Sequence, residues 1–334
     1  MDHRAATLRM AGVLLGIGLL GCSVTRQTEV LLLQPPGQLP ATTELADTPF
    51  YPQQRYQCGP AALATVLQAQ AIEVTPDELV DAVYIPALHG SLPEEMAATA
   101  RRYGLLAYRL QASLDDLLTE LARGNPVLVY QNLGLSWLPR WHFAVAIGYS
   151  LPDRELILRS GTTRRWHTTL ASFERTWSRG DYWALVILPP GEIPASARMT
   201  EYVRAARELE QTAGSEQALP AYQAATLRWP GQSLPWLALG NSHYARSEYA
   251  AAEQAFRQAS HVAAYQPEVW NNLAFALLQN SCPQRALQAA RCAIDTASDD
   301  AVRFRESLEE IRHAATGADA PHCRAINCPV SSSQ

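Results

Sequence analysis

The sequence of 334 residues contains no lysine, so that all 27 of its basic residues are arginines. Together with 32 acidic residues they give a formal net charge of -5. The arginines form no basic stripe, and a chain without one lacks the electrostatic pattern of a nucleic-acid-binding protein. We therefore expect no nucleic-acid partner, and the arginine-rich balance alone identifies no other partner.

A hydrophobic run of membrane-spanning length is also missing. Residues 10–20 are apolar, follow two arginines and end before Gly21 and Cys22, but the run is shorter than the roughly 20 residues that cross a bilayer. The pattern resembles a lipoprotein signal peptide over residues 1–21, cleaved so that Cys22 carries the lipid. The alternative is an ordinary short membrane anchor. Because Ser23 rather than an aspartate follows Cys22, the resemblance to Gram-negative lipoproteins implies an outer-membrane protein that faces the periplasm.

Charged residues make up only 18% of the chain and hydrophobic residues 48%, which excludes a disordered or polytopic membrane protein. The length favours two domains. Residues 22–46 are rich in Thr, Gln, Pro and Gly around one apolar patch, so we expect a lipidated tether there. Pro189-Pro190-Gly191 interrupts every periodicity and marks the predicted domain boundary.

Residues 47–190 show helical periodicity first and strand periodicity afterwards, which predicts an α+β domain. The predicted helices are residues 61–70, 76–83, 93–103 and 114–123, and the predicted strands are residues 127–131, 142–149, 155–159 and 183–188.

An internal repeat follows the boundary, because Tyr202, Trp236 and Trp270 recur at intervals of 34 residues with small residues in register between them. This pattern resembles the tetratricopeptide repeat over residues 198–315, in about three copies, with a C-terminal tail over residues 316–334. The resemblance implies an all-α domain whose groove binds a protein partner. The alternative is an unrelated helical bundle.

The chemistry depends on a cysteine and a histidine. Cys58 stands at the start of the apolar helix predicted after it, where backbone N–H groups favour an anion, so we expect a lowered thiol pKa. His142 opens a buried strand, and a cysteine followed about eighty residues later by a histidine is the papain-like order. The alternative for Cys58 is a small buried hydrophobe, as a free cysteine usually is.

Around these residues the sequence resembles the bacteriocin-processing cysteine peptidases, family 39 of the papain-like cysteine class, in a stand-alone lipoprotein form with tetratricopeptide repeats. The resemblance implies that Cys58 is the nucleophile and His142 the general base and acid. It also implies that Gln53 is the side-chain donor of the oxyanion hole, with Gln54 as its substitute. This chemistry requires no cofactor and no metal, so neither is expected.

The third catalytic position departs from this family, because the alignment places Ser160 where the relatives have an aspartate. A serine can orient the imidazole but cannot stabilise an imidazolium by charge. Asp153 is the alternative orienting residue, and His167 is the weaker rival base. His89 is expected in a loop.

Four tryptophans, Trp137, Trp141, Trp166 and Trp177, form an aromatic cluster that can line a peptide groove, although packing beneath the sheet is the preferred interpretation.

Two functions of different classes remain open. The first is an envelope-anchored thiol peptidase that cleaves a peptide or protein held by its repeats. The second is a catalytically impaired lipoprotein that binds peptides and scaffolds an envelope complex. Acyl transfer to an amine is a third possibility, since one fold supports several such chemistries.

The remaining cysteines, Cys282, Cys292, Cys323 and Cys328, are expected to form disulfides in an oxidising envelope. Cys282 and Cys292 share one predicted helix, where ten residues span roughly 15 Å and exceed the reach of roughly 7 Å between Cα atoms. Each must then pair with the tail, which would staple it across the last repeat. The alternatives are four free thiols or a local Cys323–Cys328 loop.

Overall fold

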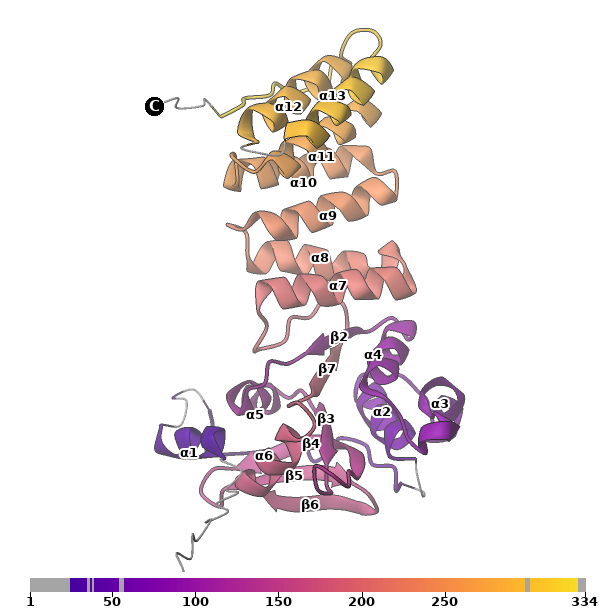
Figure 1. The fold of residues 1–334 in the computed structure, drawn as a ribbon, viewed down its shortest axis with the longest axis vertical. Helices are drawn as coiled ribbons and strands as arrows, with labels where there is room; N and C mark the ends of the chain where they lie inside the picture. The colour runs from indigo at the N-terminus through magenta and orange to yellow at the C-terminus, as the bar shows by residue number, and fades with distance from the viewer. Residues whose placement is uncertain (1–24, 35–36, 38, 54–56, 298–300, 330–334) are drawn as a thin grey trace, which may run out of the picture.

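A computed structural model describes residues 25–34, 37, 39–53, 57–297 and 301–329 (Figure 1). It contains an α+β region followed by an all-α region, which confirms the expected fold class. Cys22 and the expected signal peptide lie outside the described residues, as does Gln54. Within the part of the chain that is described, no helix is both long and apolar enough to cross a membrane.

A seven-stranded antiparallel sheet forms the centre of the first region, in the order β2-β7-β3-β4-β5-β6, with β1 paired to β4. The strands are β1 (Thr42–Glu44), β2 (Leu106–Arg109), β3 (Val127–Asn132), β4 (Trp141–Ser150), β5 (Glu155–Ser160), β6 (Thr163–Thr169) and β7 (Ala184–Leu188).

Helices cover both faces of this sheet (Figure 1). One core joins α2, α3 and α4 to side chains such as Phe143 and Val145, and the other joins α1, α5 and α6 to their neighbours on β4, such as Ala144 and Ala146. Neighbouring residues on β4 therefore alternate between the two cores, as the pleat of a strand requires. The helices are α1 (Arg26–Leu33), α2 (Cys58–Ala69), α3 (Pro76–Val83), η1 (Pro86–Leu88), α4 (Pro93–Arg102), α5 (Leu114–Ala122) and α6 (Leu170–Ser178).

The segment expected to be a tether contains part of the folded domain. Its helix α1 buries Leu31 and Thr28, and β1 pairs with the end of β4. The buried carboxylate of Glu174 accepts hydrogen bonds from the backbone N–H groups of Gln27 and Thr28, at 3.0 and 2.8 Å. The tether prediction is therefore wrong for these elements, because long-range contacts to α5 and α6 order a segment that local composition describes as a linker.

The second region is a stack of antiparallel helices above the sheet (Figure 1). Trp236 and Trp270 occupy equivalent places, since each indole N–H donates to a backbone carbonyl six residues earlier, of Pro230 and Ala264. Gly240 has no room for a side chain against the ring of Phe256, as expected where two helices cross. The helices are α7 (Met199–Ala213), α8 (Ser215–Arg228), α9 (Ser233–Ala245), α10 (Tyr249–Val262), α11 (Pro267–Gln279), α12 (Pro283–Thr296) and α13 (Ala301–Ala314).

The connection between the regions is rigidly held. Strand β7 ends at Leu188 and α7 begins at Met199, and the intervening loop gives backbone N–H groups of Ala195 and Ser196 to the buried carboxylate of Glu120. One hydrophobic core runs without a break from the sheet into α7 and α8. The first repeat is thus packed as part of the α+β region.

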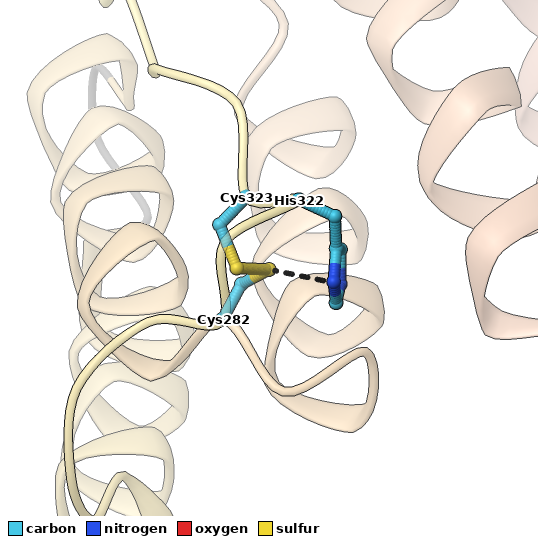
Figure 2. Close-up of side chains that lie close together, drawn as sticks. All are labelled: Cys282, His322 and Cys323. Atoms are coloured by element: carbon cyan, nitrogen blue, oxygen red, sulfur yellow. Dashed lines mark hydrogen bonds between the residues drawn. A yellow bond between two sulfur atoms is a disulfide. The ribbon is translucent and has the colours of Figure 1, made fainter.

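Two disulfides attach the C-terminal tail to the last helices. Cys282 is bonded to Cys323, and Cys292 is bonded to Cys328, with Cα atoms 5.7 and 5.4 Å apart. His322 lies beside the first disulfide (Figure 2), and its Nε2 is 2.9 Å from the carbonyl oxygen of Asn280. Cys282, His322 and Cys323 are close enough to share a ligand, but the S–S bond uses both sulfur atoms that a metal ion would need.

Candidate active site

Cys58 is the first residue of α2 and lies where that helix meets β4. It is the free cysteine of the described residues and is partly buried. The backbone N–H groups of Phe143, Gly59 and Cys58 itself surround its sulfur. The sulfur therefore lies beside the backbone of the residue that follows His142.

His142 is the second residue of β4, and its imidazole is held from the neighbouring strand. Ser160 ends β5, and its Oγ lies 2.9 Å from Nε2 of His142. An N–H at Nε2 that donates to this hydroxyl leaves Nδ1 unprotonated and able to accept a proton. Ser160, which the sequence places at the third catalytic position, thus contacts His142 directly.

Gln53 reaches the same place from the segment before α2. Its backbone N–H donates to the carbonyl of Gly161, and its Nε2 donates to the carbonyl of Phe143 at 3.3 Å. The amide carries two hydrogens, so one remains for a second acceptor beside Cys58.

A cavity of about 560 Å³ brings these groups together, since Gln53, Cys58 and His142 all line it. One wall consists of the loop Leu88–Leu92, and another includes Tyr130, whose ring stacks on that of Trp141 with the centroids 5.0 Å apart. The sequence did not indicate either wall. A loop with a left-handed residue at His89 and a tyrosine inside a strand gives no local sign of a binding surface.

The proton affinities of the pair favour two neutral groups at rest. Burial raises the pKa of Cys58, although the surrounding N–H groups act in the opposite direction. Burial, assisted by the charge of Arg140, lowers the pKa of His142 to about 4. The expected lowering of the thiol pKa is therefore wrong, because desolvation outweighs the N–H groups at the helix start.

The other candidates lie elsewhere. Asp153 bonds Ser150 at the β4–β5 turn, and Ser150 lies eight residues along β4 from His142, a rise of about 26 Å. His167 lies on β6 with its Nδ1 2.8 Å from Glu155, outside the set of described residues that line the cavity. His89 is in a loop, as expected, and that loop forms the cavity wall.

The four tryptophans do not form one cluster beneath the sheet. Trp177 is fully buried, but Trp137, Trp141 and Trp166 are exposed. Of the four, only Trp141 lines the cavity. The preferred packing interpretation is therefore wrong for three of them, since Trp137 lies in the β3–β4 turn, Trp141 is the first residue of β4, and Trp166 lies on β6, the outermost strand.

Three solved structures show similarity to the first region. A putative C39-like peptidase from Bacillus anthracis is 17% identical with a TM-score of 0.38, covering 44% of this chain and 97% of that chain. A double glycine motif protease from an AMS/PCAT transporter, solved with its leader peptide, is 20% identical with a TM-score of 0.33, covering 42% and 91%. The peptidase domain of Streptococcus ComA, a bi-functional ABC transporter, is 16% identical with a TM-score of 0.35, covering 42% and 98%.

A search of curated proteins finds no match. The family model described as Peptidase_C39 like family matches residues 45–182, a range that contains Gln53, Cys58, His142 and Ser160. Over these residues, the chain is similar to the Peptidase C39-like family.

Proposed function

We propose that this protein is a thiol peptidase in which Cys58 is the nucleophile and His142 the general base and acid. One observation carries the proposal: Cys58, His142 and Gln53 line one cavity, and Ser160 holds the imidazole by Nε2. The similarity of residues 45–182 to a peptidase family supports it.

The reaction begins from two neutral groups. As the sulfur of Cys58 bonds to the substrate carbonyl carbon, Nδ1 of His142 takes the thiol proton. The carbonyl oxygen becomes an oxyanion, which accepts hydrogen bonds from the backbone N–H of Cys58 and the remaining amide hydrogen of Gln53. The C–N bond then breaks, and His142 gives its proton to the leaving amine. Water, deprotonated by His142, finally hydrolyses the thioester and restores the thiol.

In this proposal the protein acts in the cell envelope. A lipid on Cys22 would hold the protein at the outer membrane, facing the periplasm. The repeats would bind a protein partner, as tetratricopeptide repeats do. A cavity of about 350 Å³ between α9 and α11 supports this role, since the amides of Asn241 and Asn272, bonded at 3.1 Å, lie there beside Tyr244 and Phe275.

A second function rests on one specific observation. The residue that bonds Nε2 of His142 is a neutral serine, which leaves an imidazolium without a carboxylate to stabilise it. In this second proposal the cavity holds a peptide without rapid cleavage while the repeats scaffold a complex.

Peptide-library turnover by His142→Ala separates the two proposals, with His167→Ala as a matched control. A peptidase predicts that His142→Ala loses turnover and that His167→Ala keeps it. Equal turnover by both variants contradicts the role of His142, and library peptides that bind without cleavage by the wild type favour the scaffold.

A further inference from the structure

The turn between β3 and β4 presents large apolar side chains to solvent. Leu133, Leu135, Trp137 and Leu138 are all exposed, and Trp137 most of all, at 79% of its surface. Exposed apolar side chains that gather in one place mark a contact surface more often than isolated ones do. We call residues 133–138 the hairpin tip.

The hairpin tip is an ordered structure. Oδ1 of Asn132 accepts hydrogen bonds from the N–H groups of Gly134 and Arg140, both at 2.9 Å. Leu135 and Leu138 exchange two backbone hydrogen bonds at 3.1 Å. A side chain at Gly134 would lie 2.3 Å from the carbonyl oxygen of Leu138. The backbone thus holds the leucines and the tryptophan outward in a fixed arrangement.

The substrate cavity does not account for the hairpin tip. The cavity is lined by residues 139–143, which follow the tip. None of the exposed residues 133, 135, 137 and 138 is among the described residues that line the cavity. The chain has no carboxylate between Glu120 and Asp153. Arg140 lies two residues after the tip, and Arg179 donates to the carbonyl of Asn132 at the base of the tip, at 2.9 Å. The surface is therefore apolar with an arginine rim.

The N-terminal helix and the hairpin share one support, α6. Glu174 on α6 binds the first turn of α1, while Thr176 and Arg179 bind the end of β3. Five residues of helix separate the two attachments by about 8 Å. Cys22 precedes Arg26 by four residues, a reach of at most about 14 Å. A lipid on Cys22 would therefore bring this side of the domain to the membrane surface.

We propose that the hairpin tip contacts the lipid surface that holds the lipid anchor. Tryptophan prefers the headgroup region, leucine the acyl boundary, and the arginines face the phosphates of anionic lipids. This inference rests on the proposed lipid at Cys22. It places the part of the cavity that Pro139–Trp141 line next to the bilayer, so that the substrates are peptides at the membrane surface.

Vesicle sedimentation tests the contact independently of both the lipid anchor and catalysis. The protein is residues 22–334 with Cys22→Ser, which contains every described residue, mixed with vesicles of equal parts phosphatidylethanolamine and phosphatidylglycerol. We expect the protein with the unchanged tip to sediment with the vesicles. The double variant Trp137→Ser and Leu138→Ser should reduce the bound fraction about tenfold. The matched control, Trp166→Ser with Leu227→Ser, removes an exposed tryptophan and an exposed leucine elsewhere and should bind as the wild type does.

Peptide turnover without vesicles, with circular dichroism to verify folding, completes the design. The tip variant should keep the turnover of the wild type. A wild type that stays in the supernatant, or a tip variant that sediments equally, overturns the inference. A tip variant that loses turnover in solution while its sedimentation is unchanged also overturns it, since the tip then binds substrate. Absence of turnover in every protein would contradict the peptidase proposal but leave the sedimentation result intact.

Discussion

The protonation state of His142 sets the pH dependence of the proposed reaction. Burial lowers its pKa from 6.5 to about 4, so the imidazole is neutral over most of the acidic range. We therefore expect kcat/KM to stay high through pH 6 and to fall only as pH approaches about 4, where the base becomes protonated. A pH profile with a buffer-independent acid limb measures this. An acid limb near the ordinary histidine value would contradict the buried, neutral imidazole.

Protonation of His142 also changes the stability of the protein. The direction of this change follows from the pKa of His142 in the folded and in the unfolded protein. The unfolded chain, with the ordinary pKa, binds the proton on His142 at a higher pH than the folded protein does. The stabilisation is therefore complete above the unfolded pKa and decreases as pH falls toward the folded pKa. The free energy of unfolding of His142→Ala, measured against pH, should therefore fall less between pH 6.5 and about pH 4 than that of the wild type. The same pH dependence in both proteins would contradict this contribution of His142.

Ser160 acts on the reaction through the imidazole. Removing its hydroxyl by Ser160→Ala should lower the rate by roughly twofold to tenfold, the value of one neutral hydrogen bond. Removing the base by His142→Ala should cost about 10²-fold or more. Ser160→Asp should increase the rate and move the acid limb upward, because a carboxylate favours the imidazolium. Measured kcat/KM that responds to neither Ser160 substitution would place the orienting residue elsewhere.

Among the elements, helix α1 offers the sharpest test of a long-range contact. Glu174→Gln replaces a buried carboxylate that accepts two backbone N–H groups with an amide that has only one acceptor atom. The expected loss is about 2 kcal/mol of unfolding free energy. Urea denaturation measures the loss, and Glu29→Gln on the exposed face of α1 is the matched control. Equal stability of the two variants would show that α1 is not held by Glu174.

Local signals explain which elements the sequence predicts well. Helix α3 has the predicted bounds, because Pro76 occupies the first turn and Thr75 forms a capping box with Glu78. Strand β3 and the helices α4 and α5 are also confirmed within a residue. These elements carry their start signals and their periodicity within their own residues.

The missed elements depend on partners far away in the chain. The composition of helix α1 predicts a linker, because the order of this helix comes from Glu174, which is more than 140 residues away. Strand β6, with its mostly polar and exposed side chains, lacks the alternation of a half-buried strand. The cavity wall at residues 88–92 also gives no local signal. The motif does predict Cys58, His142, Gln53 and Ser160 as candidates, and the structure brings the first three to one cavity with Ser160 bonded to His142.

At the scale of the whole molecule, the two disulfides tie the tail to the last repeat. Ile326 of the tail is buried in the core of the last helices, and Oδ1 of Asp319 accepts a hydrogen bond from the backbone N–H of Gln284 at the start of α12. Closing loops of this length stabilises a protein by about 4 kcal/mol each. We expect the double variant Cys323→Ser and Cys328→Ser to lower the unfolding temperature of the repeats, measured by calorimetry.

Non-reducing peptide mapping tests the pairing directly. The expected linked peptides contain Cys282 with Cys323 and Cys292 with Cys328. A Cys323–Cys328 peptide, or four free thiols in protein isolated from the envelope, would contradict the staple.

The proposed peptidase activity depends on the thiol of Cys58 as its nucleophile. The most direct measurement is hydrolysis of one cleaved library peptide by the wild type and by Cys58→Ala, at equal concentration, with equal unfolding temperatures showing that both are folded. If Cys58 is the nucleophile, Cys58→Ala reduces turnover to the uncatalysed background. Turnover by Cys58→Ala equal to that of the wild type would contradict it.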